Sequence, residues 1–265
     1  MRKVKCKRSL SNASVSSYSK KYLLFGKNWH VKNISICPSS EKVLTKWLED
    51  CPLSESSNPR VVFVKKQTKG YGQYGRYWYS PSGGLWMSAA IPTKIGVENA
   101  SLFGLSVAYN FCLELENIGI TAKIKWPNDI LVNDKKLAGF LPRLILRSNK
   151  LRYLRIGIGL NTNNDTPESG ISLKKLLDKK YIPLSIWASK VILILNKSIL
   201  LLDSNQPFYY HADKFLWSTK IIDSSSGIHS EIIGFQKDGS LKVCKNKTII
   251  SLRRWRNRRG GDINL

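Results

Sequence analysis

The stretch TAKIKWPNDILVNDKKLAGFLPRLIL, residues 121–146, predicts neighbouring antiparallel strands. The extended runs at 121–126, 130–132 and 137–146 have strand-like length and composition. VNDKK, between the last two runs, is typical of a hairpin turn. Because another extended run follows at 151–160, this part of the chain predicts a β-sheet.

Segments on both sides of this stretch predict helices that cover the sheet. A capped amphipathic helix is expected over 39–50, and further helices over 100–116, 183–204 and 207–218. The run at 61–66 and the segment GGLWMSAAIP at 83–92 are expected to be extended, and short β runs resume from residue 221. The predicted fold class is α+β, with a mixed β-sheet covered by helices and a small C-terminal β unit.

The segment KGYGQYGRYW, residues 69–78, carries the G-x-G-x-x-G spacing of a dinucleotide-binding turn. Such a turn needs a preceding strand, a following helix and an acid about 20 residues further on. Only the strand is present, because aromatic residues and Pro81 follow the glycines, and the first acid downstream is Glu98. The sequence therefore indicates a different phosphate loop.

The composition indicates a globular and strongly basic chain. Its 265 residues are 42% hydrophobic and carry a formal net charge of +25. The electric field of so basic a protein attracts polyanions, acidic proteins and anionic small molecules. Because the charge is spread along the chain, a basic surface is favoured over a specific nucleic-acid groove.

The cysteines and histidines disfavour several other classes of site. The five cysteines form no CxxC pair, the three histidines lie far from them, and no G-x-S-x-G segment is present. A metal site, a disulfide framework and a Ser-His-Asp hydrolase are therefore not expected. The reduced cytoplasm is the expected compartment.

The N-terminus leaves the compartment open. The first 40 residues contain no acid and are rich in Lys, Arg and Ser, which suits both a disordered basic tail and an organellar transit peptide. No membrane association is expected, because the longest apolar segment, Val191 to Leu202, is interrupted by Asn196 and Lys197.

Four short stretches carry the residues suited to phosphate chemistry. They are QTKGYGQYGRYW at 67–78, KWPND at 125–129, DKKLAG at 134–139 and GIGLN at 157–161. Glycines let backbone N–H groups approach an anion, and Lys and Arg neutralise developing negative charge. Asp and Asn can orient a metal ion or hydroxyl groups. The set indicates nucleotide chemistry at a phosphate.

These stretches, in this order and spacing, resemble the biotin–protein ligases, which attach biotin to a carboxylase lysine. The resemblance covers residues 31–173, with the serine-rich helix start CPSSEKVL at 37–44. It implies the class II synthetase-like fold of the biotin and lipoate ligases. It also implies a catalytic domain over 29–218 and a shortened SH3-like domain over 219–265, and the composition predicts a basic tail over 1–28.

The resemblance implies a two-step reaction with ATP and Mg²⁺. Biotin would react with ATP to give biotinyl-5'-AMP, and a lysine of the biotin carboxyl carrier protein of acetyl-CoA carboxylase would then take the biotinyl group. Mg²⁺ would be held mainly through the ATP phosphates, and no residue is assigned as its ligand. Lys136 would bridge the biotin carboxylate and the phosphate, with Arg76 and Asp129 completing the catalytic set.

The resemblance also implies two sets of binding residues. Biotin would be bound by Ser39, Ser40, Gln67, Gly70, Tyr71, Gly72, Lys136 and Gly139. The nucleotide would be bound by Gln73, Arg76, Trp78, Lys125, Asn128 and Asn161. The loop 70–75 would order over biotinyl-AMP. Gln73 departs from the family, whose loops commonly carry arginine there, so this enzyme is expected either to release biotinyl-AMP more readily or to compensate with another cation.

Three alternatives remain open. A lipoate or octanoate ligase has the same fold and adenylate chemistry, and an inactive relative would share the motifs. A basic nucleic-acid-binding protein is the third. Specific DNA binding is not expected by the family's route, because the polar segment before the catalytic part is only about 30 residues long, too short for a winged-helix module.

Overall fold

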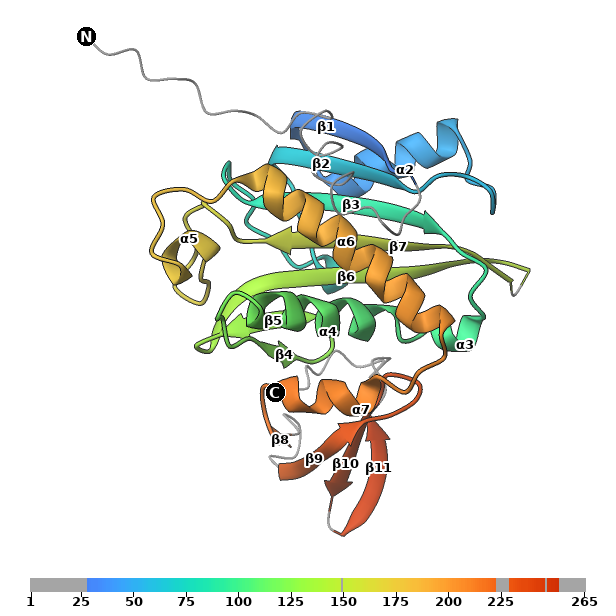
Figure 1. Ribbon diagram of the computed structural model, residues 1–265, viewed down its shortest axis with the longest axis vertical. Helices are drawn as coiled ribbons and strands as arrows, with labels where there is room; N and C mark the ends of the chain where they lie inside the picture. The colour runs from blue at the N-terminus through green and yellow to red at the C-terminus, as the bar shows by residue number, and fades with distance from the viewer. Residues whose placement is uncertain (1–27, 149, 223–228, 246, 253–265) are drawn as a thin grey trace.

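The computed structural model describes residues 28–148, 150–222, 229–245 and 247–252. A seven-stranded sheet lies between helices, and a small four-stranded sheet packs below it (Figure 1). The predicted tail over 1–28 falls, except for residue 28, outside the described residues. The observed architecture is the expected α+β class.

The large sheet has the strand order β1-β2-β3-β7-β6-β5-β4. Strands β1 and β2 are parallel, and every other neighbouring pair is antiparallel, so the sheet is mixed. The strand bounds are β1 His30–Cys37, β2 Arg60–Gln67, β3 Leu85–Pro92, β4 Lys123–Lys125, β5 Asp129–Val132, β6 Lys135–Arg147 and β7 Lys150–Leu160.

Alternation along β2 sends side chains to two separate apolar clusters. Val61 and Phe63 pack into the larger cluster, under the helices α4 and α6, whereas Val62 and Val64 pack into a smaller cluster under α2. The helix bounds are α2 Ser40–Asp50, α3 Val97–Ala100, α4 Phe103–Glu116, α5 Leu173–Leu176, α6 Leu184–Asp203 and α7 Tyr209–Ala212. Helices therefore cover both faces of the sheet, as Figure 1 shows.

The longest helix, α6, is apolar enough by length and composition to cross a membrane. Its buried residues include Trp187, Val191 and Leu195, which belong to the larger cluster beneath it. Packing against α4 and the sheet accounts for its hydrophobicity.

The hairpin predicted from VNDKK joins β5 to β6. Val132 pairs with Lys135, and the two turn residues, Asn133 and Asp134, have φ angles of 49° and 58°. A two-residue turn with positive φ at both positions matches the twist of the flanking strands, and Asn and Asp tolerate it well. The turn sets the register that pairs Lys136 with Leu131, and the Lys136 side chain reaches Asp129, two residues away from Leu131 on β5.

The predicted helix over 207–218 was wrong in its length. α7 ends at Ala212, a 3-10 turn follows over Asp213–Phe215, and Leu216 is extended. The backbone N–H of Trp217 then donates to the carbonyl of Ile124 at 3.0 Å. Pairing with the sheet edge outweighs helix propensity here. Strand β1 was not predicted.

The small sheet has the strand order β11-β10-β9-β8 and is antiparallel. Its strands are β8 Lys220–Ile222, β9 His229–Phe235, β10 Leu241–Lys245 and β11 Thr248–Leu252. Asp213 joins it to the main body, because its Oδ1 accepts a hydrogen bond from the N–H of Phe235 at 2.7 Å. Burial raises the pKa of Asp213, and this hydrogen bond partly offsets the rise.

Candidate functional site

A cavity of about 200 Å³ opens between the start of α2, the loop 70–78 and the central strands of the large sheet. All four stretches singled out in the sequence contribute to its walls. The predicted residues that line it are Ser39, Ser40, Gln67, Tyr71, Gly72, Gln73, Arg76, Trp78, Asn128, Asp129, Lys136 and Gly139. The fold thus brings together segments that are more than 90 residues apart in the chain.

One end of the cavity is polar and is built on the first turn of α2. Ser39 is the N-cap, and its hydroxyl accepts a hydrogen bond from the N–H of Glu41 at 3.2 Å. The N–H of Ser40 donates to Gln67 Oε1 at 2.7 Å, and the Ser40 hydroxyl lies 2.8 Å from the hydroxyl of Ser88. These buried groups hold one another in place before any ligand binds.

The other end of the cavity is cationic. Lys136, at the start of β6, places its Nζ 2.7 Å from Asp129 Oδ2 and 4.7 Å from the centre of the Trp78 ring. Asp129 Oδ1 is buried and has no hydrogen-bond partner. A cation held between a carboxylate and an aromatic face is positioned to meet an incoming anion.

Trp78 forms a wall of the cavity because two glycines make room for its indole. A Cβ on Gly159 would lie 2.5 Å from Trp78 Nε1, and a Cβ on Gly139 would lie 3.0 Å from the ring. Those glycines face each other on β7 and β6. The indole N–H is buried without a hydrogen-bond partner, so it can serve a ligand.

The loop 70–78 closes on itself as an irregular hairpin. Tyr71 pairs with Tyr77, and the N–H of Gly72 donates to the carbonyl of Arg76 at 2.8 Å. Its tip is the 3-10 turn Gln73–Gly75, and no α-helix follows. The structure therefore excludes a dinucleotide-binding turn, as the sequence indicated.

The sequence profile of the Biotin/lipoate A/B protein ligase family matches residues 39–161, the segment that builds the cavity. The central part of this chain is therefore similar to the domain that this profile describes. The matched segment contains the serine-rich start of α2, the glycine loop and the strands β2 to β7 of the large sheet.

Named relatives share this domain. The bifunctional ligase/repressor BirA of Bacillus subtilis is 38% identical over 113 residues, which are 41% of this chain and 35% of the relative. The biotin–[acetyl-CoA-carboxylase] ligase of Paracoccus denitrificans is 31% identical over 113 residues, 41% of this chain and 46% of the relative. The chain therefore spans less than half of the length of either relative.

Solved structures share the fold of this chain over most of its length. The biotin protein ligase from Aquifex aeolicus, in complex with biotin and ATP, superposes with a TM-score of 0.60 at 22% identity, over 86% of this chain and 96% of that one. The biotin acetyl coenzyme A carboxylase synthetase from Helicobacter pylori, with bound biotinylated ATP, gives 0.55 at 19% identity, over 84% and 100%. These likenesses establish the fold.

Three predicted site residues lie outside the cavity walls. Lys125 places its Nζ 4.9 Å from the ring centre of Trp217. Asn161 supports the site from behind, because its Nδ2 donates to the carbonyl of Lys136 at 3.1 Å. Gly70 permits a close approach, since a Cβ there would lie 2.5 Å from Ser80 Oγ and 2.7 Å from the carbonyl oxygen of Trp78.

Several residues that line the cavity were not predicted from the sequence to belong to the site. Glu41, Tyr77, Ser88, Gly157 and Gly159 line the cavity but were not assigned as site residues. The available signal was in GIGLN, where glycines at alternate strand positions indicate a face with a close neighbour.

No cysteine is among the residues that line the cavity. Burial raises the pKa of the nearby Cys37 thiol, and its hydrogen bond with the backbone of Ser39 offsets this only in part. Within the described residues, no group of three or more His, Cys, Asp or Glu side chains could hold a metal ion. The arrangement suits an elongated ligand with a polar head at α2 and an anionic group at Lys136.

Proposed function

We propose that this protein is a biotin–protein ligase, which forms biotinyl-5'-AMP from biotin and ATP and transfers biotin to a lysine of a biotin carboxyl carrier protein. The observation that carries the proposal is the polarity of the cavity. Serine hydroxyls and Gln67 lie at one end, and Lys136 lies at the other. Biotin has the matching polarity, with a ureido head and a carboxylate tail.

The chemical step needs two anions to meet, the biotin carboxylate and the α-phosphate of ATP. Lys136 is the central cation in this proposal, because its ammonium group can hydrogen-bond both anions at once. The ion pair with Asp129, at 2.7 Å, fixes the ammonium group before the substrates arrive. Arg76, in the loop wall, adds positive charge on the phosphate side.

The nucleotide is assigned to the surface formed by Trp78, Gln73 and Asn128. Trp78 offers an aromatic face and an indole N–H, while Asn128 is held by its Nδ2, which donates to the carbonyl of Phe140 at 2.9 Å. Mg²⁺ would arrive with ATP and neutralise phosphate charge. Asp129, whose Oδ1 is buried without a partner, is the carboxylate suited to contact it.

The acceptor proposed for this enzyme is an acidic carrier domain. A net charge of +25 would attract such a partner and speed its association. The solved relatives include a ligase bound to biotin and ATP and a synthetase bound to biotinylated ATP, which supports the same substrates here. The cytoplasm is the proposed compartment.

The test is direct transfer of label. The purified protein would be incubated with ATP, Mg²⁺, labelled biotin and a biotin carboxyl carrier domain, and the modified lysine would be found by mass spectrometry. Label on that lysine, dependent on ATP, supports the proposal. Label from lipoate or octanoate but not from biotin would assign the chain to the other branch of the family, and no label from either acid would refute ligase activity.

A further inference from the structure

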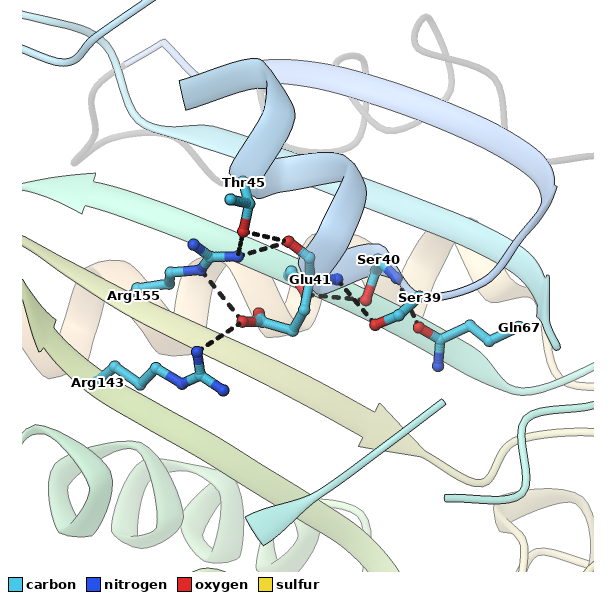
Figure 2. A network of polar contacts seen from close by, with 8 residues as sticks. Ser39, Ser40, Glu41, Thr45, Gln67, Arg143 and Arg155 are labelled. Carbon is cyan, nitrogen blue, oxygen red and sulfur yellow. Dashed lines mark hydrogen bonds and ion pairs between the residues drawn. The ribbon is translucent and has the colours of Figure 1, made fainter. Parts of the chain in front are cut away.

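A buried acid, Glu41, forms part of the cavity wall at its polar end. Its side chain is 4% exposed, and it lines the cavity beside Gly157. It follows Ser39 and Ser40 directly, so it lies in the first turn of α2 (Figure 2). A buried carboxylate is costly unless it is paired, and its surroundings therefore indicate its use.

Arg155 on β7 holds this carboxylate in place. Arg155 Nε lies 3.1 Å from Glu41 Oε2, and Arg155 Nη2 donates to the carbonyl of Glu41 at 2.5 Å and to Thr45 Oγ1 at 2.6 Å. Arg143 on β6 approaches the same carboxylate oxygen at 4.0 Å. Figure 2 shows both guanidinium groups directed at Glu41 from the sheet. The two guanidinium groups on the sheet thus balance the negative charge of the Glu41 carboxylate.

The carboxylate still lacks hydrogen bonds. Both of its oxygens and Arg155 Nε are buried and have no hydrogen-bond partner, so the contact with Arg155 is an ion pair without an aligned N–H. Glu41 Oε1 lies 3.3 Å from the position that a Cβ on Gly157 would occupy. Glu41 and Gly157 both line the cavity, so this oxygen lies beside the space that a side chain at position 157 would fill. Buried acceptors are rarely left unsatisfied, which points to a ligand donor.

The neighbouring polar groups are already engaged. Gln67 Oε1 accepts from the N–H of Ser40, and Gln67 Nε2 donates to Ser80. The Ser39 hydroxyl accepts from the N–H of Glu41. Glu41 Oε1 is therefore an acceptor at this end of the cavity that is not used within the protein.

We propose that Glu41 is a specificity residue, whose Oε1 accepts a hydrogen bond from an N–H group of the substrate head. This inference rests on the proposed function and deepens it. The cyclic urea of biotin has two N–H groups, whereas lipoate and octanoate have none. The carboxylate therefore favours biotin and leaves a buried charge without a donor when an acid lacking N–H groups binds.

The test compares two heads in the same cavity. Affinities for biotin and for 2-iminobiotin, whose cyclic guanidinium head is cationic at neutral pH, would be measured by calorimetry for the wild type and for Glu41→Gln. Removing the carboxylate leaves Arg143 and Arg155 facing the head. Biotin is expected to weaken by about fivefold to tenfold, and 2-iminobiotin by at least tenfold more than biotin.

The matched control is Thr45→Val, which removes an Arg155 contact outside the cavity wall. It should leave the ratio of the two affinities unchanged, and in turnover Glu41→Gln should raise KM for biotin with kcat retained. If Glu41→Gln is unfolded, the double variant Glu41→Gln/Arg155→Met removes both members of the pair, and the expected weakening of biotin stays the same.

The outcomes separate the two proposals. A wild type that binds no biotin refutes the proposed function and the role of Glu41 with it. A wild type that binds biotin, together with a Glu41→Gln variant that keeps the ratio of the two affinities, overturns the role of Glu41 alone. In that case the ion pair only fixes α2 to the sheet.

Discussion

Replacing Lys136 with alanine removes the cation on which the proposed adenylation depends. In the folded protein its Nζ contacts Asp129 Oδ2 at 2.7 Å and lies 4.7 Å from the Trp78 ring centre. A hydrogen bond between charged groups contributes roughly 1.5–3 kcal/mol. Contacts to two substrate anions therefore amount to roughly 3–6 kcal/mol, which corresponds to a loss of roughly 10²- to 10⁴-fold in kcat/KM.

The loss is expected to exceed that of simple charge removal, because the variant leaves Asp129 without its partner. Its side chain is 19% exposed, so its charge is only partly screened by solvent, and it would repel the incoming phosphates. The assay is biotin-dependent exchange of labelled pyrophosphate into ATP, which reports adenylation without the carrier. Thermal unfolding would confirm that the variant is folded.

Lys135→Ala is the matched control. Lys135 has the same charge and lies beside Lys136 on β6, but it does not line the cavity. It should retain activity within about threefold, as expected for a charge away from the site. Equal losses in the two variants, or a loss below tenfold for Lys136→Ala, would refute the assignment of Lys136 as the bridging cation.

Four further outcomes are expected. Gly70→Ala should lower the free energy of unfolding by about 1–3 kcal/mol and weaken biotin binding, as followed by thermal unfolding and calorimetry. Gly72→Ala, with no atom nearer than 4.0 Å to its Cβ, should leave the free energy of unfolding unchanged. Biotin transfer to an acidic carrier should slow as salt rises and the screening length falls to about 8 Å at 0.15 M, and a rate indifferent to salt would contradict electrostatic steering by the basic surface. Gln73→Arg should slow release of biotinyl-AMP by about ten- to a hundredfold, as measured by bystander labelling, and unchanged release would show that position 73 does not hold the intermediate. Burial raises the pKa of Asp213 above its unfolded value, so the contribution of Asp213 to stability is greatest below the unfolded pKa and is lost as pH rises through the folded pKa. The stability of Asp213→Asn relative to the wild type should therefore increase between pH 4 and 7, as followed by denaturant unfolding.

The sheet could be predicted where local sequence alone decides the structure. The hairpin from β5 to β6 follows from VNDKK, since Asn133 and Asp134 tolerate the positive φ that a two-residue turn requires. Strand β1 and the end of α7 could not be predicted in the same way. β1 exists through its parallel pairing with β2, and the segment after α7 is extended because Trp217 bonds to Ile124. Both depend on partners that are remote in sequence.

The site residues also differ in whether local sequence alone could predict them. Lys136, Gln67 and the glycine loop could be assigned because their motifs occur in a specific order, although each motif alone is weak. The space that the Trp78 indole occupies could not be predicted from the sequence, because this space depends on the strand register that sets Gly139 opposite Gly159. Sequence spacing does not reveal which strands become neighbours.

The sequence alone offered no reason to assign Glu41 to the site. An acid in the first turn of a helix has an ordinary explanation, since the N-terminus of a helix favours negative charge. The role that we propose for Glu41 in ligand recognition depends on Arg155, which is 114 residues away in the sequence. On β7 the residues Arg155, Gly157 and Gly159 share one face, while Ile156 and Ile158 face the core. A charged residue followed by two alternate glycines thus marks the floor of the cavity, and the acid above it becomes a candidate for ligand recognition once the strand's face is known.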